Sequence, residues 1–194
     1  MRILAFTDSH GNKKILRELS KKVKKENPDI IICAGDFTNF ERKMEETLFD
    51  INMLGKPVFL VHGNHEDPEN IQNAVDLFDH IKFIHKKRFR IGKYEIMGFG
   101  GGGFSQTDKE FERYSKHIKT KKRLILVTHA PPYGTKLDFL HNAHRGNRSF
   151  SNFIRKSQPL LSISGHLHET FGEQDKIGKT VLINPGARGL IIDV

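Results

Sequence analysis

The sequence predicts an α/β fold in four layers, α/β/β/α, a sandwich of two mixed β-sheets flanked by helices. Two observations lead to this prediction. In the first half of the chain, short apolar strands alternate with segments of helical periodicity, as in a parallel sheet covered on both faces. In the second half, closely spaced strands and a return to β-forming residues near the end indicate a second sheet.

The first half contains three predicted strands and two predicted helices. Apolar residues run without alternation at 3–6, 29–33 and 57–61, where we expect the strands. Asn12 can cap a helix whose apolar face consists of Ile15, Leu16, Leu19 and Val23. The tetrapeptide Thr-Asn-Phe-Glu at 38–41 has the pattern of a capping box and predicts a second helix, with an apolar face of Phe40, Met44, Leu48 and Ile51.

The second half is richer in strands. We expect strands at 81–84, 89–91 and 94–97, with a hairpin turn at Gly92 and Lys93, and further strands at 124–127, 160–163, 179–183 and 190–194. A second capping box at 107–110 predicts a polar helix that runs to about Lys119, and 150–155 falls in another helix. The chain has no repeat, linker or clear boundary, so residues 1–194 are expected to form a single domain.

The composition indicates a reduced intracellular protein with anionic partners. A chain of 194 residues buries a sizeable core without disulfides, and its one cysteine, Cys33, lies in an apolar run typical of a buried thiol. The start of the chain leads directly into a strand and no run is long enough to span a bilayer, so we expect a cytoplasmic protein with no membrane partner. Lys and Arg outnumber Asp and Glu by 32 to 23, which favours phosphate esters, nucleotides or nucleic acid as partners. Because many lysines fall on predicted helix faces, charge alone does not favour a nucleic-acid groove.

Five short polar clusters each follow an apolar run. They contain Asp, His and Asn, which are ligands for divalent transition metals. Because ligands gather at the carboxyl ends of the strands in α/β sheets, we expect these clusters to converge on one edge. Their residues are Asp8 and His10, Asp36, Asn64 and His65, His129, and His166 and His168.

The number of candidate ligands suits two metal ions. Asp36 stands alone after its strand and is the natural carboxylate to bridge both ions. One ion would be completed by Asp8, His10 and His168, and the other by Asn64, His129 and His166. Nitrogen and oxygen ligands without thiolate favour Mn²⁺, Fe, Zn²⁺, Co²⁺ or Ni²⁺ over Mg²⁺ or Ca²⁺, and among these we favour Mn²⁺.

Two such ions would support hydrolysis. A water that bridges them loses a proton near neutral pH and becomes a nucleophilic hydroxide. Two dications, two carboxylates and one hydroxide carry a formal charge of about +1, so the site would attract an anion, and a phosphate ester suits it. His65 is not needed as a ligand and is the candidate general acid that protonates the leaving oxygen.

Together these motifs resemble the signature of the calcineurin-like metallophosphoesterase superfamily. The resemblance rests on Asp8-x-His10, Gly35-Asp36, Gly63-Asn64-His65-Glu66, His129 and Gly165-His166-x-His168, and it runs from Arg2 to about Pro185. The segments His144-Arg145-Gly146 and Asn184-Pro185-Gly186 also resemble small prokaryotic and archaeal members. The resemblance implies a binuclear metal-dependent phosphoesterase and agrees with the ligand set above and with His65 as the acid.

One departure from the family pattern indicates which class of phosphoesterase the chain resembles. Where the protein Ser/Thr phosphatases carry Asp-Arg-Gly after Gly-Asp, this chain has Phe-Thr-Asn-Phe at 37–40, which is similar to the class III phosphodiesterase branch. A diester monoanion would also neutralise the charge of the site, which favours a phosphodiesterase over a phosphomonoesterase. A small nuclease on the same site is an open alternative. A non-catalytic metal-binding scaffold is disfavoured, because every ligand is present.

Several other residues allow two interpretations. His144 and Arg145 lie in a basic loop before the last helix and are the candidate substrate-binding residues at the rim. Glu66 either orients a neighbour or lies on the surface. The glycine-rich segment 98–103 lacks the spacing of a phosphate-binding loop and is interpreted as a close-approach turn. The histidines without partners at ligand spacing are expected to be ordinary, and these are His62, His80, His85 and His117.

Overall fold

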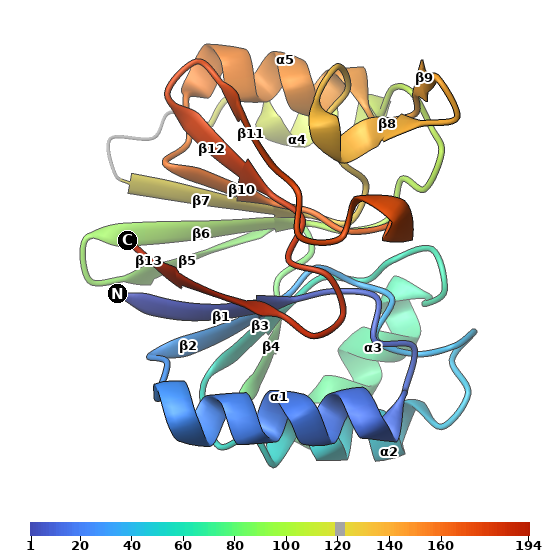
Figure 1. Ribbon diagram of the computed structural model, residues 1–194, viewed down its shortest axis with the longest axis vertical. Coiled ribbons are helices and arrows are strands. Elements are labelled where there is room, and N and C mark those ends of the chain that lie inside the picture. Colours follow the sequence, from blue (N-terminus) through green and yellow to red (C-terminus); the bar gives the residue numbers. More distant parts are fainter. Residues whose placement is uncertain (119–122) are drawn as a thin grey trace.

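Two β-sheets pack face to face in the computed structural model, which describes residues 1–118 and 123–194 (Figure 1). The first sheet consists, in spatial order, of β13 (Leu190–Asp193), β1 (Arg2–Phe6), β2 (Ile30–Cys33), β3 (Val58–Leu60) and β4 (Ile81–Phe83). The second consists of β11 (Gln174–Ile177), β12 (Thr180–Ile183), β10 (Leu161–Ile163), β7 (Arg123–Thr128), β6 (Tyr94–Phe99) and β5 (Lys87–Ile91). A small hairpin joins β8 (Phe139–Leu140) to β9 (Ala143–His144).

Helices cover the outer face of each sheet. On the first sheet lie α1 (Lys13–Glu26), α2 (Met44–Asn52) and α3 (Pro68–Val75), and on the second lie α4 (Lys109–Ser115) and α5 (Arg148–Ser157) (Figure 1). Two short 3₁₀ turns span Lys136–Asp138 and His168–Thr170. The predicted α/β/β/α sandwich is therefore confirmed. No helix in the described part of the chain is long and apolar enough to cross a membrane.

Both sheets are parallel at their centres and antiparallel at an edge. Strands β1 to β4 pair in parallel, as do β6, β7, β10 and β12, while β13, β5 and β11 pair antiparallel to their neighbours. The predicted turn at Gly92 and Lys93 is confirmed, because Ile91 pairs with Tyr94 across it. The parallel strands bring their carboxyl ends to the same side of the sandwich.

The strand β1 shows how the core is divided. Successive side chains of a strand point to opposite faces of the sheet. Leu4 and Phe6 pack with the helices on the outer face, whereas Ile3 and Ala5 pack against the second sheet. Every residue of β1 after Arg2 is buried, as expected for a strand covered on both sides.

The first predicted helix is confirmed and the second is corrected. Asn12 caps α1, since its side chain accepts hydrogen bonds from the N–H groups of Lys14 and Ile15. The predicted capping box at 38–41 is wrong, because α2 begins only at Met44 and residues 39–42 form a tight turn. The Thr38 hydroxyl accepts from the N–H of Glu41, as a capping residue would, but no helix follows, and the same hydroxyl donates to Glu66. Phe40 leaves the predicted apolar face and is exposed.

The second capping box is also shifted. Asp108, not Thr107, caps α4, because its carboxylate accepts from the N–H of Phe111. The helix ends at Ser115, and the predicted end at Lys119 lies outside the described residues.

Candidate metal centre

The five predicted clusters lie at the carboxyl ends of the parallel strands. The loops after β1, β2, β3, β7 and β10 carry the candidate ligands. Their donor atoms form three groups, and within each group all the atoms lie within 4.8 Å of one another. These groups are Asp8, His10 and His168; Asp8, Asp36 and His129; and His10, Asp36 and His65. Residues that are up to 160 positions apart in the chain thus meet at one edge, as the sequence predicted.

The first group is compact. The Nε2 atoms of His10 and His168 lie 3.2 Å apart, and Asp8 Oδ1 lies 3.6 Å from His168 Nε2. In the second group His129 Nε2 lies 3.5 Å from Asp36 Oδ2, and it also lies 3.1 Å from Oδ1 of Asn64, outside the group. Asp8, His10 and Asp36 each belong to two of the three groups, so the groups overlap and form one connected centre.

Each carboxylate has one oxygen held by the protein and one directed to the centre. Asp8 Oδ2 accepts from the Thr7 hydroxyl at 2.6 Å and from the N–H of His166 at 3.0 Å. Asp36 Oδ1 accepts from the N–H of His65 at 3.0 Å. The opposite oxygens, Asp8 Oδ1 and Asp36 Oδ2, face the histidines. This arrangement orients the carboxylates before any ligand binds.

Two imidazoles are oriented by backbone carbonyls. His129 Nδ1 donates to the carbonyl of Ala34 at 2.9 Å, and His10 Nδ1 donates to the carbonyl of Thr38 at 3.1 Å. Because a carbonyl only accepts, each Nδ1 carries the proton and each neutral ring presents the lone pair of Nε2. Those lone pairs point to the centre, which is how histidines bind metals.

Two buried atoms of the candidate ligands lack a partner. Asp8 Oδ1 and His166 Nε2 make no hydrogen bond with any described residue, and neither does Nδ1 of the candidate acid His65. Leaving a buried polar atom unpaired costs free energy, and most such atoms in proteins are paired. Lone pairs without donors, gathered with other oxygen and nitrogen atoms, fit divalent cations.

The backbone at the centre is strained. Asp8, His10, Asp36 and His166 have φ between 47° and 72°, in the left-handed region that side chains with a Cβ disfavour. Such conformations cluster at functional sites, where the surrounding structure holds them. Sequence patterns did not reveal this feature, because each residue alone is compatible with an ordinary turn.

Two glycines are required by close approach to the ligands. A Cβ on Gly63 would lie 1.8 Å from Asp36 Oδ1, and one on Gly165 would lie 2.4 Å from Asp8 Oδ2. Neither glycine has a positive φ. Gly35 differs from them, because its φ of 96° requires glycine for the turn at the strand end.

Glu66 is buried, and it is the residue that sequence reasoning left undecided. Its carboxylate accepts from the N–H groups of Asp36, Thr38 and Gly63, at 3.1, 2.8 and 2.8 Å. It therefore ties together the loops after β2 and β3 that carry candidate ligands. The interpretation in which Glu66 orients its neighbours is supported, and the surface interpretation is wrong.

The protonation of the centre follows from burial and neighbouring charge. Burial, with the charge of Asp36, raises the pKa of Glu66 to about 7, and burial lowers the pKa of His166 to about 4. Burial works to raise the pKa of Asp8, but the neighbouring His168 and His129 and the hydrogen bonds from Thr7 and His166 outweigh it and lower that pKa. The same contact with Asp8 raises the pKa of His168. Burial lowers the pKa of His65 against the opposing charge of Asp36.

The candidate substrate residues lie outside the ligand groups. His144 is in β9, and its Nδ1 lies 2.8 Å from Oδ1 of the buried Asp138. His144 and Glu169 line a cavity of about 620 Å³, and Glu169 directly follows the candidate ligand His168. Arg145 follows β9 and donates its N–H to the carbonyl of Asp138. No described contact joins the His144 ring or the Arg145 side chain to a candidate ligand.

The glycine-rich loop borders the centre. A Cβ on Gly103 would lie 3.8 Å from Asn64 and 4.0 Å from His166. Beside this loop, His62 and His85 pack with ring centroids 4.5 Å apart, and His85 Nδ1 accepts from the N–H of Gly100. Neither histidine belongs to a ligand group among the described residues.

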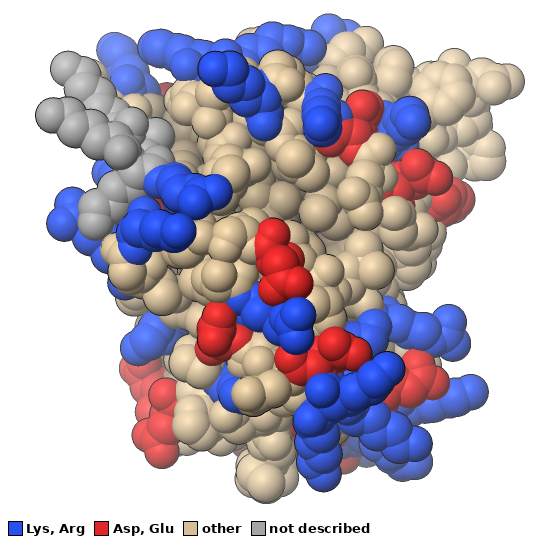
Figure 2. Space-filling view, turned by 60° about the vertical axis from the view of Figure 1, so that its left-hand side comes forward, with Lys and Arg blue, Asp and Glu red and all other residues tan. Residues whose placement is uncertain are grey.

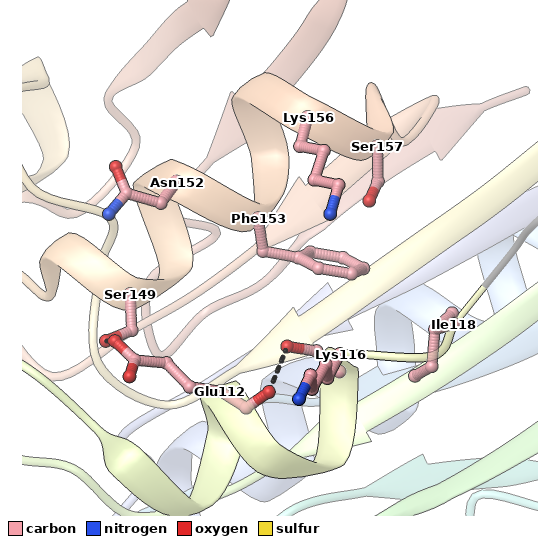
Figure 3. A pocket seen from close by; sticks show the side chains of 9 residues that line it. Glu112, Lys116, Ile118, Ser149, Asn152, Phe153, Lys156 and Ser157 are labelled. Atoms are coloured by element: carbon pink, nitrogen blue, oxygen red, sulfur yellow. Dashed lines mark hydrogen bonds between the residues drawn. The ribbon is translucent and has the colours of Figure 1, made fainter.

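The surface carries charge of both signs, and a further cavity lies between two helices. Figure 2 shows one face on which Lys and Arg form separate groups with Asp and Glu among them, and uncharged side chains lie between these groups. The cavity of about 330 Å³ in Figure 3 lies between α4 and α5, and residues such as Glu112, Lys116 and Phe153 line it. None of its lining residues is a candidate ligand.

The chain belongs to the calcineurin-like phosphoesterase family, whose sequence profile it matches over residues 1–170. The predicted resemblance is thereby confirmed. It is 30% identical to an uncharacterized protein of Methanocaldococcus jannaschii, over 99% of this chain and 91% of the relative. It is also 23% identical to a probable glycerophosphodiester phosphodiesterase of Arcobacter nitrofigilis, over 74% of this chain and 58% of the relative.

Solved structures share the fold. The crystal structure of TT1561 of Thermus thermophilus superimposes with a TM-score of 0.76 at 18% identity, over 95% of this chain and 88% of that one. Members of the family are phosphoester hydrolases that use divalent metal ions, and the groups of metal-ligating side chains described above are consistent with that chemistry.

Proposed function

We propose that this chain is a phosphodiesterase that binds two divalent transition-metal ions, with Mn²⁺ favoured, and hydrolyses a small phosphate diester. The observation that carries the proposal is the convergence of metal-ligating side chains from five loops. Two of their buried atoms, Asp8 Oδ1 and His166 Nε2, have no hydrogen-bond donor among the described residues. We further propose that residues 1–194 act as one domain, because β13 near the end of the chain pairs with β1.

The ligand roles follow from which atoms face each other. Asp8, His10 and His168 would hold one ion, and Asn64, His129 and His166 the other. Asp36 would contact both, since its donor atoms share one group with His129 and another with His10. When bound, two divalent cations supply positive charge for the phosphoryl oxygens and lower the pKa of the attacking water.

His65 is the proposed general acid. The backbone N–H of His65 donates to Asp36, and the imidazole lies next to the same carboxylate, beside the proposed metal ions. The side chain keeps some exposure to solvent. There it can protonate the leaving oxygen. Burial lowers the pKa of His65, which makes its imidazolium a stronger acid and limits that form to lower pH.

Charge favours a diester over a monoester. The loaded site carries a formal charge of about +1, which a diester monoanion neutralises and a monoester dianion exceeds. The relative described as a probable glycerophosphodiester phosphodiesterase supports the same class. His144 and Arg145 are the proposed substrate contacts at the rim, and His144 is oriented there by Asp138.

The test is hydrolysis by metal-stripped protein that is reloaded with Mn²⁺, Ni²⁺, Zn²⁺, Co²⁺ or Mg²⁺ in turn. The substrates are bis-p-nitrophenyl phosphate and p-nitrophenyl phosphate, and the control is His80→Ala, which removes an exposed histidine outside the centre. We expect a transition metal to restore activity, with the diester hydrolysed faster.

Each other outcome selects a different conclusion. Faster hydrolysis of the monoester replaces the diester proposal with a phosphomonoesterase. Salt-dependent binding and cleavage of DNA or RNA replaces it with a nuclease. Folded protein that holds two ions and hydrolyses neither ester is a non-catalytic scaffold.

A further inference from the structure

Four exposed phenylalanines pack against histidines of the centre or its rim. Exposed phenylalanine is unusual in a protein that buries most of its apolar side chains, and here each ring lies within about 5 Å of an imidazole. The pairs are Phe40 with His65 at 3.9 Å, Phe104 with His166 at 4.5 Å, Phe171 with His168 at 4.9 Å and Phe139 with His144 at 5.2 Å between ring centroids. Of these, Phe40 and Phe104 are the most exposed, at 68% and 64%.

Phe40 is held out by a strained turn. Phe40 and Glu41 both have positive φ, 51° and 59°, and the N–H of Arg42 donates to the carbonyl of Asn39, which closes a tight turn with Phe40 near its tip. Turns of this kind favour Asn and Gly, so a phenylalanine there is costly.

The turn is also anchored from behind. The Glu41 carboxylate accepts from the N–H of Asp67 at 2.7 Å and from the Asn70 amide at 3.0 Å, at the start of α3. The backbone is thus strained where it holds the Phe40 ring in solvent. The ring stacks on the proposed acid His65 with an interplanar angle of 19°. Packing of the core does not account for this placement.

Phe104 is displayed by the glycine-rich loop. Gly101, Gly102 and Gly103 all have positive φ, and the N–H of Gly101 donates to the carbonyl of His62. Gly103 approaches Asn64 and His166, so the loop brings Phe104 to the other side of the ligand set, edge-on to His166. The two rings therefore come from unrelated loops and meet different parts of the same centre.

We propose that Phe40 and Phe104 are specificity residues that bind a flat, aromatic organic group of the phosphoester. This inference rests on the proposed function. With the phosphate at the histidines and carboxylates, the ester groups must extend outward past these rings. Because Phe40 stacks on His65, the group beside it belongs to the leaving alcohol. An aromatic contact of this kind strengthens binding by about two- to twelve-fold.

The experiment measures binding without turnover. Phenylphosphonate and methylphosphonate, whose P–C bonds are not hydrolysed, are titrated by calorimetry into protein loaded with Mn²⁺. The variants are Phe40→Ala, Phe40→Leu and Phe104→Ala. The matched control is Phe49→Ala, which removes a phenylalanine that is 54% exposed on α2.

We expect phenylphosphonate to bind the unaltered protein more tightly than methylphosphonate. Phe40→Ala and Phe104→Ala should each weaken the binding of phenylphosphonate by about two- to twelve-fold. The affinity for methylphosphonate should stay within about two-fold of that of the unaltered protein. Phe40→Leu should fall between, and Phe49→Ala should change neither ligand.

The contrary results are distinct. If Phe40→Ala weakens the binding of both phosphonates equally, Phe40 only positions His65 and the inference is wrong. It is equally wrong if the phenyl group gives no preference, or if metal-loaded protein binds neither ligand. If phenylphosphonate binds through Phe40 but no phosphoester is hydrolysed with any metal, the catalytic proposal fails and this one stands.

Discussion

Glu66 Oε2 accepts a hydrogen bond of 3.1 Å from the backbone N–H of Asp36, the residue proposed to bridge the two metals. The same oxygen accepts from the N–H of Gly63, and Oε1 accepts from the N–H and the hydroxyl of Thr38. One buried carboxylate thus fixes the position of a ligand loop without facing the metal centre itself.

Replacing Glu66 by Ala should destabilise the fold and weaken metal binding. The change leaves buried N–H donors unpaired, and we expect a loss of about 3 kcal/mol in the free energy of unfolding. Urea unfolding of metal-free protein measures this loss, and metal titration measures affinity. The control Glu69→Ala removes an exposed carboxylate three positions away on α3 and should cost well under 1 kcal/mol. Equal effects of the two variants would contradict the role of Glu66.

Gly63→Ala should abolish metal binding. The new Cβ would lie 1.8 Å from Asp36 Oδ1, so the carboxylate must move away from its place at the centre. The measurement is the number of ions bound per chain after reloading. Gly55→Asn is the control, since nothing lies within 4 Å of a Cβ there and Asn tolerates a positive φ. Two ions retained by Gly63→Ala would disprove the proposed position of Asp36.

Asp36→Ala should remove both ions, or nearly so. Bound metal stabilises the native state by mass action, by about 2.7 kcal/mol at a free concentration a hundred times Kd. We therefore expect Mn²⁺ to raise the thermal midpoint of the unaltered protein and to leave that of Asp36→Ala unchanged. An equal rise in both proteins would show that Asp36 is not a bridge.

His65→Ala should lower kcat by about 10² to 10⁴ while both ions stay bound. Because burial lowers the pKa of His65, activity of the unaltered enzyme should fall as pH rises and the imidazolium is lost, and this dependence should vanish in the variant. Steady-state rates across pH and metal content check both statements. His65 also lies in a ligand group with His10 and Asp36, so loss of an ion from the variant would make it a ligand instead.

The free energy of unfolding should depend on pH through His85. Burial lowers the pKa of His85 from 6.5 to about 4, so the unfolded chain binds more protons between these values. The contribution of His85 to the free energy of unfolding is therefore fully present above pH 6.5, and it is lost as the pH falls toward 4. His85→Gln keeps an acceptor for the N–H of Gly100 and should lose less stability on acidification. Urea unfolding at pH 7, 5.5 and 4.5 measures the difference, with the exposed His80→Gln as the control. Parallel curves for the unaltered protein and His85→Gln would exclude the effect.

The sequence by itself determined the layers of the fold and the residues that meet at the centre. Unbroken apolar runs predict buried parallel strands, and parallel strands end on one side, so the polar residues after each strand had to gather there. Asp8, Asp36 and His129 could be placed together for this reason, although they are far apart in the chain. The cap at Asn12 could be predicted too, because it depends only on the next three residues.

Only the tertiary structure decided what the loops do. The pattern at 38–41 does not show whether a helix or a tight turn follows Thr38, and in the fold the Thr38 hydroxyl is bound by Glu66, a carboxylate from the loop after β3. Phe40 therefore changed from a predicted core residue to an exposed ring on His65. The need for glycine at position 63 likewise arises from the Asp36 side chain across the sheet edge. Local patterns report the neighbours in sequence, whereas these roles are set by neighbours in space.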